Sequence, residues 1–434
     1  MSWLTRQRVQ LYLRNSMWLM PSISIVIALV FVRILHRIEV AFDLHSKFGR
    51  DIGIVVLGTI AGSTFTLVVV FASAILVAVQ LASAQLTPRI ISLVYRTGIR
   101  KFSLSLFVFT FTFSVAAMLR LGETVPMLTG YVAAYTFLFN LVLFIQFMER
   151  MGKSLRPSSA LQTVGSIGRE VIHSVYPRLL SEHDLARTEP LEHIEAKAFR
   201  TVVNLEDGAV LAFDLKGLMS LAQRSNCIIE MVPAVGDFIA EGDPLFHIYE
   251  GGTMIPEETF RNSVAIGAER TMEQDPMFAF RIIVDIASKA LSPAINDPTT
   301  AVLAVDQLHH LLRDVGKRYL AEGHEKDSAG TVRLIYRRPY WEDFVQLSLT
   351  EIRQYGRDSI QVMRRLRAML EDLIATLPAC REPLLTRELS LLLSSSKRVF
   401  PDLADQELAG VGDLQGMGGA APDEDHVVSN LTAS

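Results

Sequence analysis

Four long apolar segments within residues 1–150 constrain this chain more than any other feature. They cover about residues 17–35, 52–81, 102–119 and 128–148. Each reaches, or comes close to, the ~20 residues that a helix needs to cross ~30 Å of hydrocarbon. Charged residues make up only 20% of the chain, which also favours a membrane protein. We therefore expect residues 1–150 to form a multi-pass α-helical membrane domain.

Lysine and arginine residues near the segment ends predict the orientation. Ten lie on one side of the membrane: Arg6, Arg8, Arg14, Arg89, Arg96, Arg100, Lys101, Arg150, Lys153 and Arg156. Five lie on the other side: Arg33, Arg37, Lys47, Arg50 and Arg120. Positive residues are enriched on the cytoplasmic side, so we expect both termini in the cytoplasm. The first segment lacks a small-residue cleavage site, which favours an uncleaved anchor over a signal peptide.

The second segment carries two features that a simple membrane anchor does not need. Gly58 and Gly62 form a small-xxx-small pattern, which permits close helix packing either within the chain or between subunits. Gln80, Ser83 and Gln85 are polar residues near its end. They indicate either the polar lining of a conduit or a helix that has already left the bilayer. At ~1.5 Å per residue the segment is ~45 Å long, more than a simple crossing requires.

A change of pattern follows the expected connecting helix and linker at residues 151–199. Residues 200–204, 210–213 and 227–232 favour strands, and 214–224 a helix capped by Asp214. The run from Val235 to Ile248 resembles the turn-and-strand signature of biotinyl/lipoyl-like barrels, with glycines at its turns. We therefore expect a small β-barrel at residues 200–252. Its expected tip, Glu250-Gly251-Gly252, lacks the lysine of a carrier domain, so the barrel is expected to be structural.

Residues 253–400 are expected to be mostly helical, and 401–434 to be a disordered acidic tail. Two helices begin with Asp-Pro, at Asp275 and Asp297, and meet at a corner around Ser292–Pro298. The candidate functional residues of this corner are Arg281, Asp285, Ser292, Asn296 and Asp297. They indicate either a site that uses a carboxylate, an amide or a hydroxyl, or a capped structural corner.

Other classes of protein are disfavoured. The net charge of −4 and the lack of a concentrated basic face argue against a nucleic-acid partner. Cys227 and Cys380 match no metal spacing and no disulfide framework. The chain has no nucleophile-elbow, phosphate-loop or His-Glu-xx-His motif. We therefore assign no catalytic residue, no metal ligand and no cofactor.

Several motifs together resemble a bacterial family called domain of unknown function 2254, described as predicted membrane proteins. They are Gln85-Leu86-Thr87-Pro88-Arg89, Val235-Gly236-Asp237-Phe238, Gly242-Asp243-Pro244-Leu245, Asp275-Pro276-Met277-Phe278, the run Asp285–Pro298 and Arg353-Gln354-Tyr355-Gly356. The resemblance implies a four-helix membrane part with a cytoplasmic domain, and no established activity. It also implies a location in the bacterial inner membrane.

Two functional hypotheses follow. The first is a homo-oligomeric channel or other passive conduit in the lipid bilayer, regulated by a cytoplasmic α+β domain. The long second segment, its small residues, its polar end and the absence of acidic or basic residues at the segment centres motivate it. The second is a membrane-anchored ligand sensor, scaffold or enzyme with its site near the Ser292–Pro298 corner.

Overall fold

The computed structural model describes residues 3–43, 45–90, 98–122, 124–154, 156–181, 200–252, 254–320 and 323–418. The chain divides into two compact units. Val9–Ser159 forms the membrane unit, and Ala160–Ser434 with Met1–Arg8 forms the α+β unit. Residues 182–199 of the expected linker and 419–434 of the expected tail lie outside the described residues.

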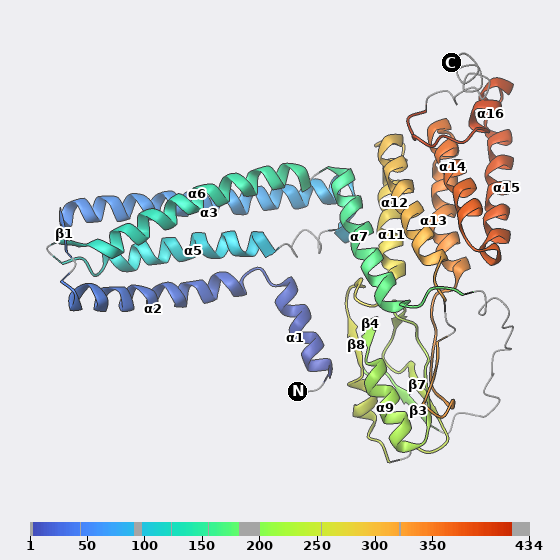
Figure 1. Ribbon diagram of the computed structural model, residues 1–434, viewed down its shortest axis with the longest axis horizontal. Helices are drawn as coiled ribbons and strands as arrows, with labels where there is room; N and C mark the ends of the chain where they lie inside the picture. The colour runs from blue at the N-terminus through green and yellow to red at the C-terminus, as the bar shows by residue number, and fades with distance from the viewer. Residues whose placement is uncertain are drawn as a thin grey trace, which may run out of the picture. The chain divides into compact units, whose positions relative to one another are not determined.

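The membrane unit contains four helices that are long and apolar enough to cross a membrane. They lie lengthwise beside one another in Figure 1: α2 (Leu19–Ala41), α3 (Arg50–Gln85), α5 (Gly98–Met118) and α6 (Met127–Ser154). Helix α1 (Trp3–Asn15) comes before them, and the short η1 (Pro88–Ile90) follows α3. Strand β1 (His45–Gly49) lies between α2 and α3, and strand β2 (Thr124–Pro126) lies between α5 and α6. The two strands pair antiparallel. The expectation of four apolar helices is confirmed.

Helix α5 packs against α2, α3 and α6, and α3 also packs against α6. Many large apolar side chains on the outer faces are exposed, such as Val26, Val55 and Ile145. A helix satisfies its own backbone hydrogen bonds, so such faces suit contact with lipid. The membrane unit is thus a helical bundle with an apolar outer surface.

Helix α3 is a single continuous helix of 36 residues. Its length is ~54 Å at 1.5 Å per residue, well beyond the ~30 Å of a hydrocarbon core. It runs through Gln80 and Ser83 to Gln85, and the Leu86 N–H donates to the Ala82 carbonyl at 2.9 Å. This agrees with the expectation that the second segment exceeds a simple crossing.

The α+β unit contains two open sheets. The five-stranded sheet has the order β3-β7-β5-β10-β9, and the three-stranded sheet has the order β6-β4-β8. The strands are β3 (Arg200–Val203), β4 (Gly208–Phe213), β5 (Ile228–Met231), β6 (Phe238–Ile239), β7 (Pro244–Tyr249), β8 (Val264–Gly267), β9 (His324–Lys326) and β10 (Val332–Tyr336). One buried apolar cluster, which includes Val210, Ile229 and Phe246, fills the space between them. The expected α+β region is confirmed.

The small closed barrel expected at residues 200–252 is not confirmed, because the described strands form no closed barrel. β5 pairs antiparallel with β7 on one side and parallel with β10 on the other, with Leu334 opposite Ile229. This stretch therefore completes its sheets with strands from later in the chain and does not close on itself. The two turn glycines do adopt positive φ as expected, +94° at Gly236 and +90° at Gly242.

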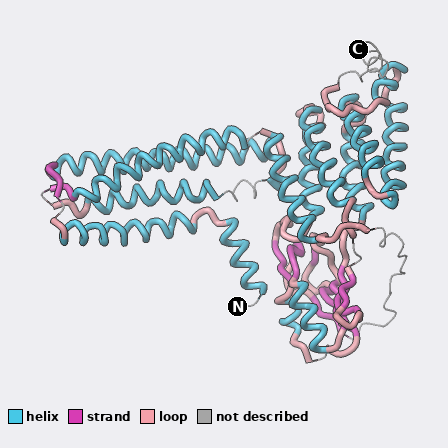
Figure 2. The backbone as a smooth tube through the Cα atoms, viewed as in Figure 1, coloured by secondary structure: helices cyan, strands magenta, loops and turns pink. Residues whose placement is uncertain are grey.

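Most of the remaining helices of the α+β unit lie together beside the sheets, while the helices at residues 215–225 and 257–261 pack against the strands (Figure 2). Their bounds are α7 (Pro157–Val175), α9 (Leu215–Ser225), α10 (Glu257–Arg261), α11 (Pro276–Ala290), α12 (Pro298–Gly316), α13 (Trp341–Tyr355), α14 (Ile360–Thr376), η2 (Ala379–Arg381), α15 (Glu382–Val399) and α16 (Leu403–Ala409). α11 packs on α12 and α13, and α14 packs on α12 and α15. Gly168 lets α7 approach closely, because a Cβ there would overlap Ala279 on α11.

Residues 401–418 of the expected disordered tail are among the described residues. Helix α16 forms there, and it packs against α14 and α15. The Asp413 carboxylate accepts hydrogen bonds from the N–H groups of Gln415, Gly416 and Gly418, at 2.9, 2.9 and 2.6 Å. The buried Arg364 donates to the Gly418 carbonyl at 3.2 Å. The Asp413 bonds close a turn within this segment, and the Arg364 bond ties it to α14.

Candidate functional site

The corner between α11 and α12 is built by local hydrogen bonds. Asp297 caps α12, because its carboxylate accepts from the Thr300 N–H at 3.0 Å and from the Thr300 hydroxyl at 2.5 Å. The Ser292 hydroxyl donates to the Lys289 carbonyl at 2.7 Å. Asn296 has a φ of +47°, a left-handed conformation that asparagine tolerates better than most residues. The presence of Asn296 beside the Asp297 cap thus has a backbone explanation.

The other two candidate residues of the corner belong to a separate ion-pair group. Arg281 donates to Asp285 at 2.7 Å and to both carboxylate oxygens of Glu351 at 2.6 Å. Glu351 raises the pKa of Arg281 most strongly, and Asp285 adds to the increase. Arg281 therefore ties α11 to α13. It lies 11 residues, or ~16 Å of helix, before Ser292, so the structure does not bring the five candidates into one site.

The candidate residues of α3 have different environments. A Cβ at Gly58 would lie 3.7 Å from the Met118 side chain of α5, so Gly58 faces a neighbouring helix. A Cβ at Gly62 would meet open space. Gln80 is exposed and Ser83 is half-buried, while the side chain of Gln85 lies outside the described residues. Within the small-residue pattern, Gly58 therefore faces α5 of the same chain, whereas Gly62 faces away from the rest of the chain.

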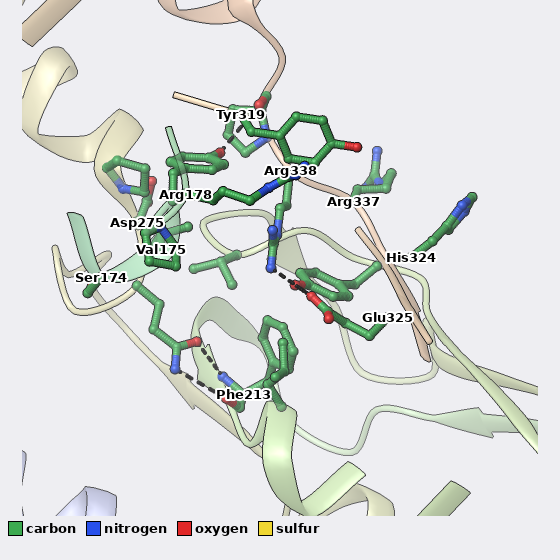
Figure 3. A pocket seen from close by; sticks show the side chains of 18 of the residues that line it. Ser174, Val175, Arg178, Phe213, Asp275, Tyr319, His324, Glu325, Arg337 and Arg338 are labelled. Atoms are coloured by element: carbon green, nitrogen blue, oxygen red, sulfur yellow. Dashed lines mark hydrogen bonds and ion pairs between the residues drawn. The ribbon is translucent and has the colours of Figure 1, made fainter. Parts of the chain in front are cut away.

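A cavity of about 1230 Å³ lies in the α+β unit, outside all of these candidate residues. The end of α7, strands β4, β9 and β10 and the start of α11 line it (Figure 3). Its lining includes charged residues (Arg178, Glu273, Asp275, His324, Glu325, Lys326, Arg337 and Arg338) and apolar or aromatic ones (Val175, Tyr176, Phe213, Leu215, Val235, Pro276, Tyr319 and Tyr336). We call it the Arg338 cavity. Its size exceeds that of many small-molecule pockets.

Arg338 is enclosed in this cavity, whereas Arg178, Lys326 and Arg337 are exposed. Its side chain is 16% exposed, and it donates to the Glu325 carboxylate at 3.2 Å (Figure 3). Its guanidinium carbon lies 4.6 Å from the ring centre of Tyr336 and 5.9 Å from that of Tyr176. Its Nε has no hydrogen-bond partner among the described residues. Burial lowers the pKa of Arg338, because removal from water destabilises the charged form.

Aromatic rings supply other walls of the cavity. Tyr176 is buried, and its hydroxyl donates to the Pro339 carbonyl at 3.3 Å. Burial raises the pKa of Tyr176, so it remains a neutral phenol. The guanidinium of Arg178 lies 3.7 Å from the ring centre of Tyr319, the geometry of a cation–π contact. The cavity thus combines cations with flat aromatic surfaces.

Asp275 fixes the start of α11 at the cavity wall. Its buried carboxylate accepts from Arg270 and, at 3.2 Å, from the Phe278 N–H. Burial raises the pKa of Asp275, and Arg270 opposes that shift. The neighbouring Gln274 side chain bonds both the N–H and the carbonyl of Phe213, at 3.1 and 3.2 Å (Figure 3). These contacts hold β4 and α11 together on either side of the cavity.

Comparison with known proteins identifies the family. The family described as "Predicted membrane protein (DUF2254)" matches residues 14–372. The chain belongs to this family. Uncharacterised proteins of Mycobacterium bovis and Mycobacterium tuberculosis are each 25% identical to it, over 94% of this chain and 81% of the relative. No solved structure matches the chain.

The DUF2254 match includes every segment that lines the Arg338 cavity, yet sequence reasoning did not predict the cavity. Its residues come from positions as far apart as Ser174 and Pro339. One local signal was present, the run Arg337-Arg338-Pro339 directly after an expected strand. Only the structure shows that Arg338 is enclosed while Arg337, with a side chain 66% exposed, pairs with Asp237. Among the described residues no group of three His, Cys, Asp or Glu could hold a metal.

Proposed function

We propose that this DUF2254 protein is a membrane-anchored receptor that binds an anionic ligand in the Arg338 cavity. The observation that carries the proposal is the enclosed guanidinium of Arg338, whose Nε is unpartnered among the described residues and whose contact to Glu325 is 3.2 Å long. A carboxylate or phosphate can accept two parallel hydrogen bonds from a guanidinium. An anionic ligand would therefore compensate the cost of burying this charge.

The rest of the lining favours a ligand with an apolar or aromatic body. Val175, Phe213, Leu215 and Pro276 provide apolar surface, and Tyr176 and Tyr336 flank the guanidinium. Small-molecule sites commonly combine such surface with a few polar groups that fix orientation. Benzoate and phenyl phosphate carry both features and serve as probes, and benzyl alcohol is their neutral counterpart.

The test is thermal unfolding of the full-length protein in detergent with each probe. We expect benzoate or phenyl phosphate to raise the unfolding midpoint, because a ligand that binds only the folded state stabilises it. Benzyl alcohol is expected to have a much smaller effect. Arg338→Ala should weaken binding by about 10- to 100-fold, the equivalent of about 1.5–3 kcal/mol for a hydrogen bond to a charged group.

Arg337→Ala is the matched control for this experiment. It removes an adjacent arginine that also lines the cavity, but one that is more exposed and already paired with Asp237. We expect it to weaken binding by less than about 3-fold, as is usual for exposed charges. Equal losses in the two variants, or no response to either anion, would contradict the proposal.

A second candidate is an oligomeric channel or passive conduit in the bacterial inner membrane, with both termini and the α+β unit in the cytoplasm. The length of α3, the open space beside Gly62 and the exposed Gln80 support it. The excess of Lys and Arg near the ends of the apolar segments supports the orientation. The candidate residues near Ser292 and Arg281 would then serve to hold the regulatory unit together.

Conductance and mass measurements test the conduit directly. We expect the purified protein to give currents in planar bilayers and to have the mass of an oligomer in detergent. Gly62→Leu should reduce oligomer formation, because it adds a bulky side chain to a face where helix backbones are expected to approach closely. Silent bilayers combined with a monomeric mass would reject the conduit, and they would leave the anion receptor intact.

A further inference from the structure

Three helices of the membrane unit bury polar side-chain atoms that have no partner among the described residues. These atoms are Oγ1 of Thr64 on α3, Oγ of Ser114 on α5, and both Oδ1 and Nδ2 of Asn140 on α6. All three residues are 0% exposed. An unpartnered polar group is costly in an apolar interior, and especially so inside a membrane protein.

The three residues lie at one level of the bundle. Phe71, Phe107 and Phe147 mark a neighbouring level, since their ring centres are 5.6 Å apart for Phe71–Phe107 and 4.1 Å apart for Phe71–Phe147. Each polar residue lies seven positions from the phenylalanine on its own helix, about two turns or ~10.5 Å. Going from the phenylalanine to the polar residue, the residue number falls by seven on α3 and α6 and rises by seven on α5.

The relative directions of the helices make these steps agree. The ring pairs Phe65–Phe111 and Phe71–Phe107 show that α3 and α5 run antiparallel, because the residue number of the contacting phenylalanine rises on α3 as it falls on α5. Helix α6 runs antiparallel to α5, so it runs parallel to α3 (Figure 1). All three steps thus lead toward the same end of the bundle.

Two apolar clusters of the membrane unit surround this polar layer. One cluster contains Leu57, Phe113 and Ala133, and the other contains Phe71 and Phe147. Thr64 and Asn140 come between the two clusters along α3 and α6, whereas Ser114 on α5 lies between Phe113 and Ala116 of the first cluster. The unpartnered atoms of the layer therefore lie in predominantly apolar surroundings.

The hydroxyl groups of the layer are not used by their own helices. Thr66, Thr110 and Thr136 each donate to the carbonyl four residues earlier, at 3.0, 3.0 and 2.7 Å. This is the usual way in which a helix satisfies a threonine in an apolar setting. Thr64 and Ser114 do not make this bond in the structure, so their hydroxyl groups remain available to a ligand.

We infer that the layer of Thr64, Ser114 and Asn140 is an internal water-binding site of the membrane bundle. An amide offers two donors and two acceptor positions, and each hydroxyl both donates and accepts. A buried water molecule typically makes about three hydrogen bonds to such groups. This inference concerns a different unit from the Arg338 cavity and goes beyond the proposed receptor function.

The charge of the layer favours water over a metal ion. Its three side chains are uncharged, and burying an uncompensated cation is expensive. The buried carboxylate of Glu39, on α2, is engaged by the Thr129 N–H and hydroxyl at 2.7 and 2.8 Å. Thr129 lies 11 residues, or ~16 Å of helix, from Asn140. A small neutral molecule therefore fits the site better than an ion.

Water-edited solid-state NMR tests the inference on the full-length protein in lipid bilayers. With ¹⁵N-labelled asparagine, the Asn140 side-chain signal is identified by its loss in Asn140→Leu. We expect rapid magnetisation transfer from water to this amide in the unsubstituted protein. The double variant Thr64→Val with Ser114→Ala should reduce the transfer by roughly half or more, because it removes two of the about three groups that hold the water.

The matched control is Thr110→Val, which removes a buried α5 hydroxyl that already bonds to the Leu106 carbonyl. It should leave the transfer to Asn140 unchanged. Absence of transfer in the unsubstituted protein would overturn the inference even if the variants fail to fold. A transfer that requires sodium, and is lost in N-methylglucamine, would overturn it in favour of a cation site.

Discussion

The Phe344→Ala variant is expected to lose about 3–5 kcal/mol of unfolding free energy in the α+β unit. Phe344 is fully buried on α13. Its ring centre lies 5.1 Å from that of Phe280 on α11 and 6.2 Å from that of Tyr176 at the cavity wall. Truncation removes both aromatic contacts and leaves a cavity where α11, α13 and the end of α7 meet, which adds to the lost burial.

Tryptophan fluorescence of the full-length protein in detergent measures this loss. Trp341 lies on the same helix, is 7% exposed, and reports on the α+β unit. At roughly 2–4 °C per kcal/mol, the unfolding midpoint should fall by roughly 10 °C. Phe238→Ala is the matched control, because Phe238 is 71% exposed. It should change stability by less than about 0.5 kcal/mol. A similar midpoint for both variants would show that the aromatic contacts of Phe344 contribute little.

Asp275→Ala is expected to destabilise the α+β unit by about 2–4 kcal/mol. The substitution removes the cap of α11 and leaves Arg270 without its carboxylate partner. Because the Arg270 side chain is 35% exposed, it can turn toward water, which keeps the loss below that of a fully buried pair. Asp275→Asn should lose less than Asp275→Ala, because an amide oxygen still accepts from the Phe278 N–H.

Asp297→Ala is the matched control, since Asp297 begins the next helix with the same Asp-Pro sequence and the same type of capping bond. It is only half-buried, and its carboxylate bonds to Thr300 rather than to an arginine. Loss of this cap should cost about 1 kcal/mol. Unfolding of the three variants, followed by tryptophan fluorescence, tests the order. Equal losses for Asp275→Ala and Asp297→Ala would mean that burial and Arg270 add nothing to the cap.

The Asp-Pro pair shows how far the sequence can predict this fold. Both helix starts follow from the capping preference of aspartate and the fixed φ of proline, which act within a few residues. The helix expected at residues 214–224 with Asp214 as its cap is likewise present, as α9 (Leu215–Ser225). The sequence does not predict that Asp275 contributes more to stability than Asp297. That difference comes from the ion pair with Arg270 and from the burial of Asp275, which both depend on tertiary contacts.

The candidate corner shows the opposite limit. Asn296 is a candidate functional residue by sequence, and its φ of +47° gives it a backbone role beside the Asp297 cap. Arg281 and Asp285 were predicted to lie near the corner, but Glu351 on another helix holds Arg281. A residue from a distant segment cannot be assigned to such a group by local spacing. The same reason explains why Arg338 and Arg337, adjacent in sequence, differ so strongly in exposure.

The sequence by itself determined the four apolar helices and the family, because hydrophobic length and short motifs are properties of contiguous residues. It also indicated most helix and strand positions in the α+β unit. Only the tertiary structure decided that β5 pairs with β10, that residues 200–252 form no closed barrel, and that the Arg338 cavity exists. The common level of Thr64, Ser114 and Asn140 also follows only from the ring pairs between helices. Each of these features depends on the register between segments far apart in the chain, which packing fixes and local sequence does not.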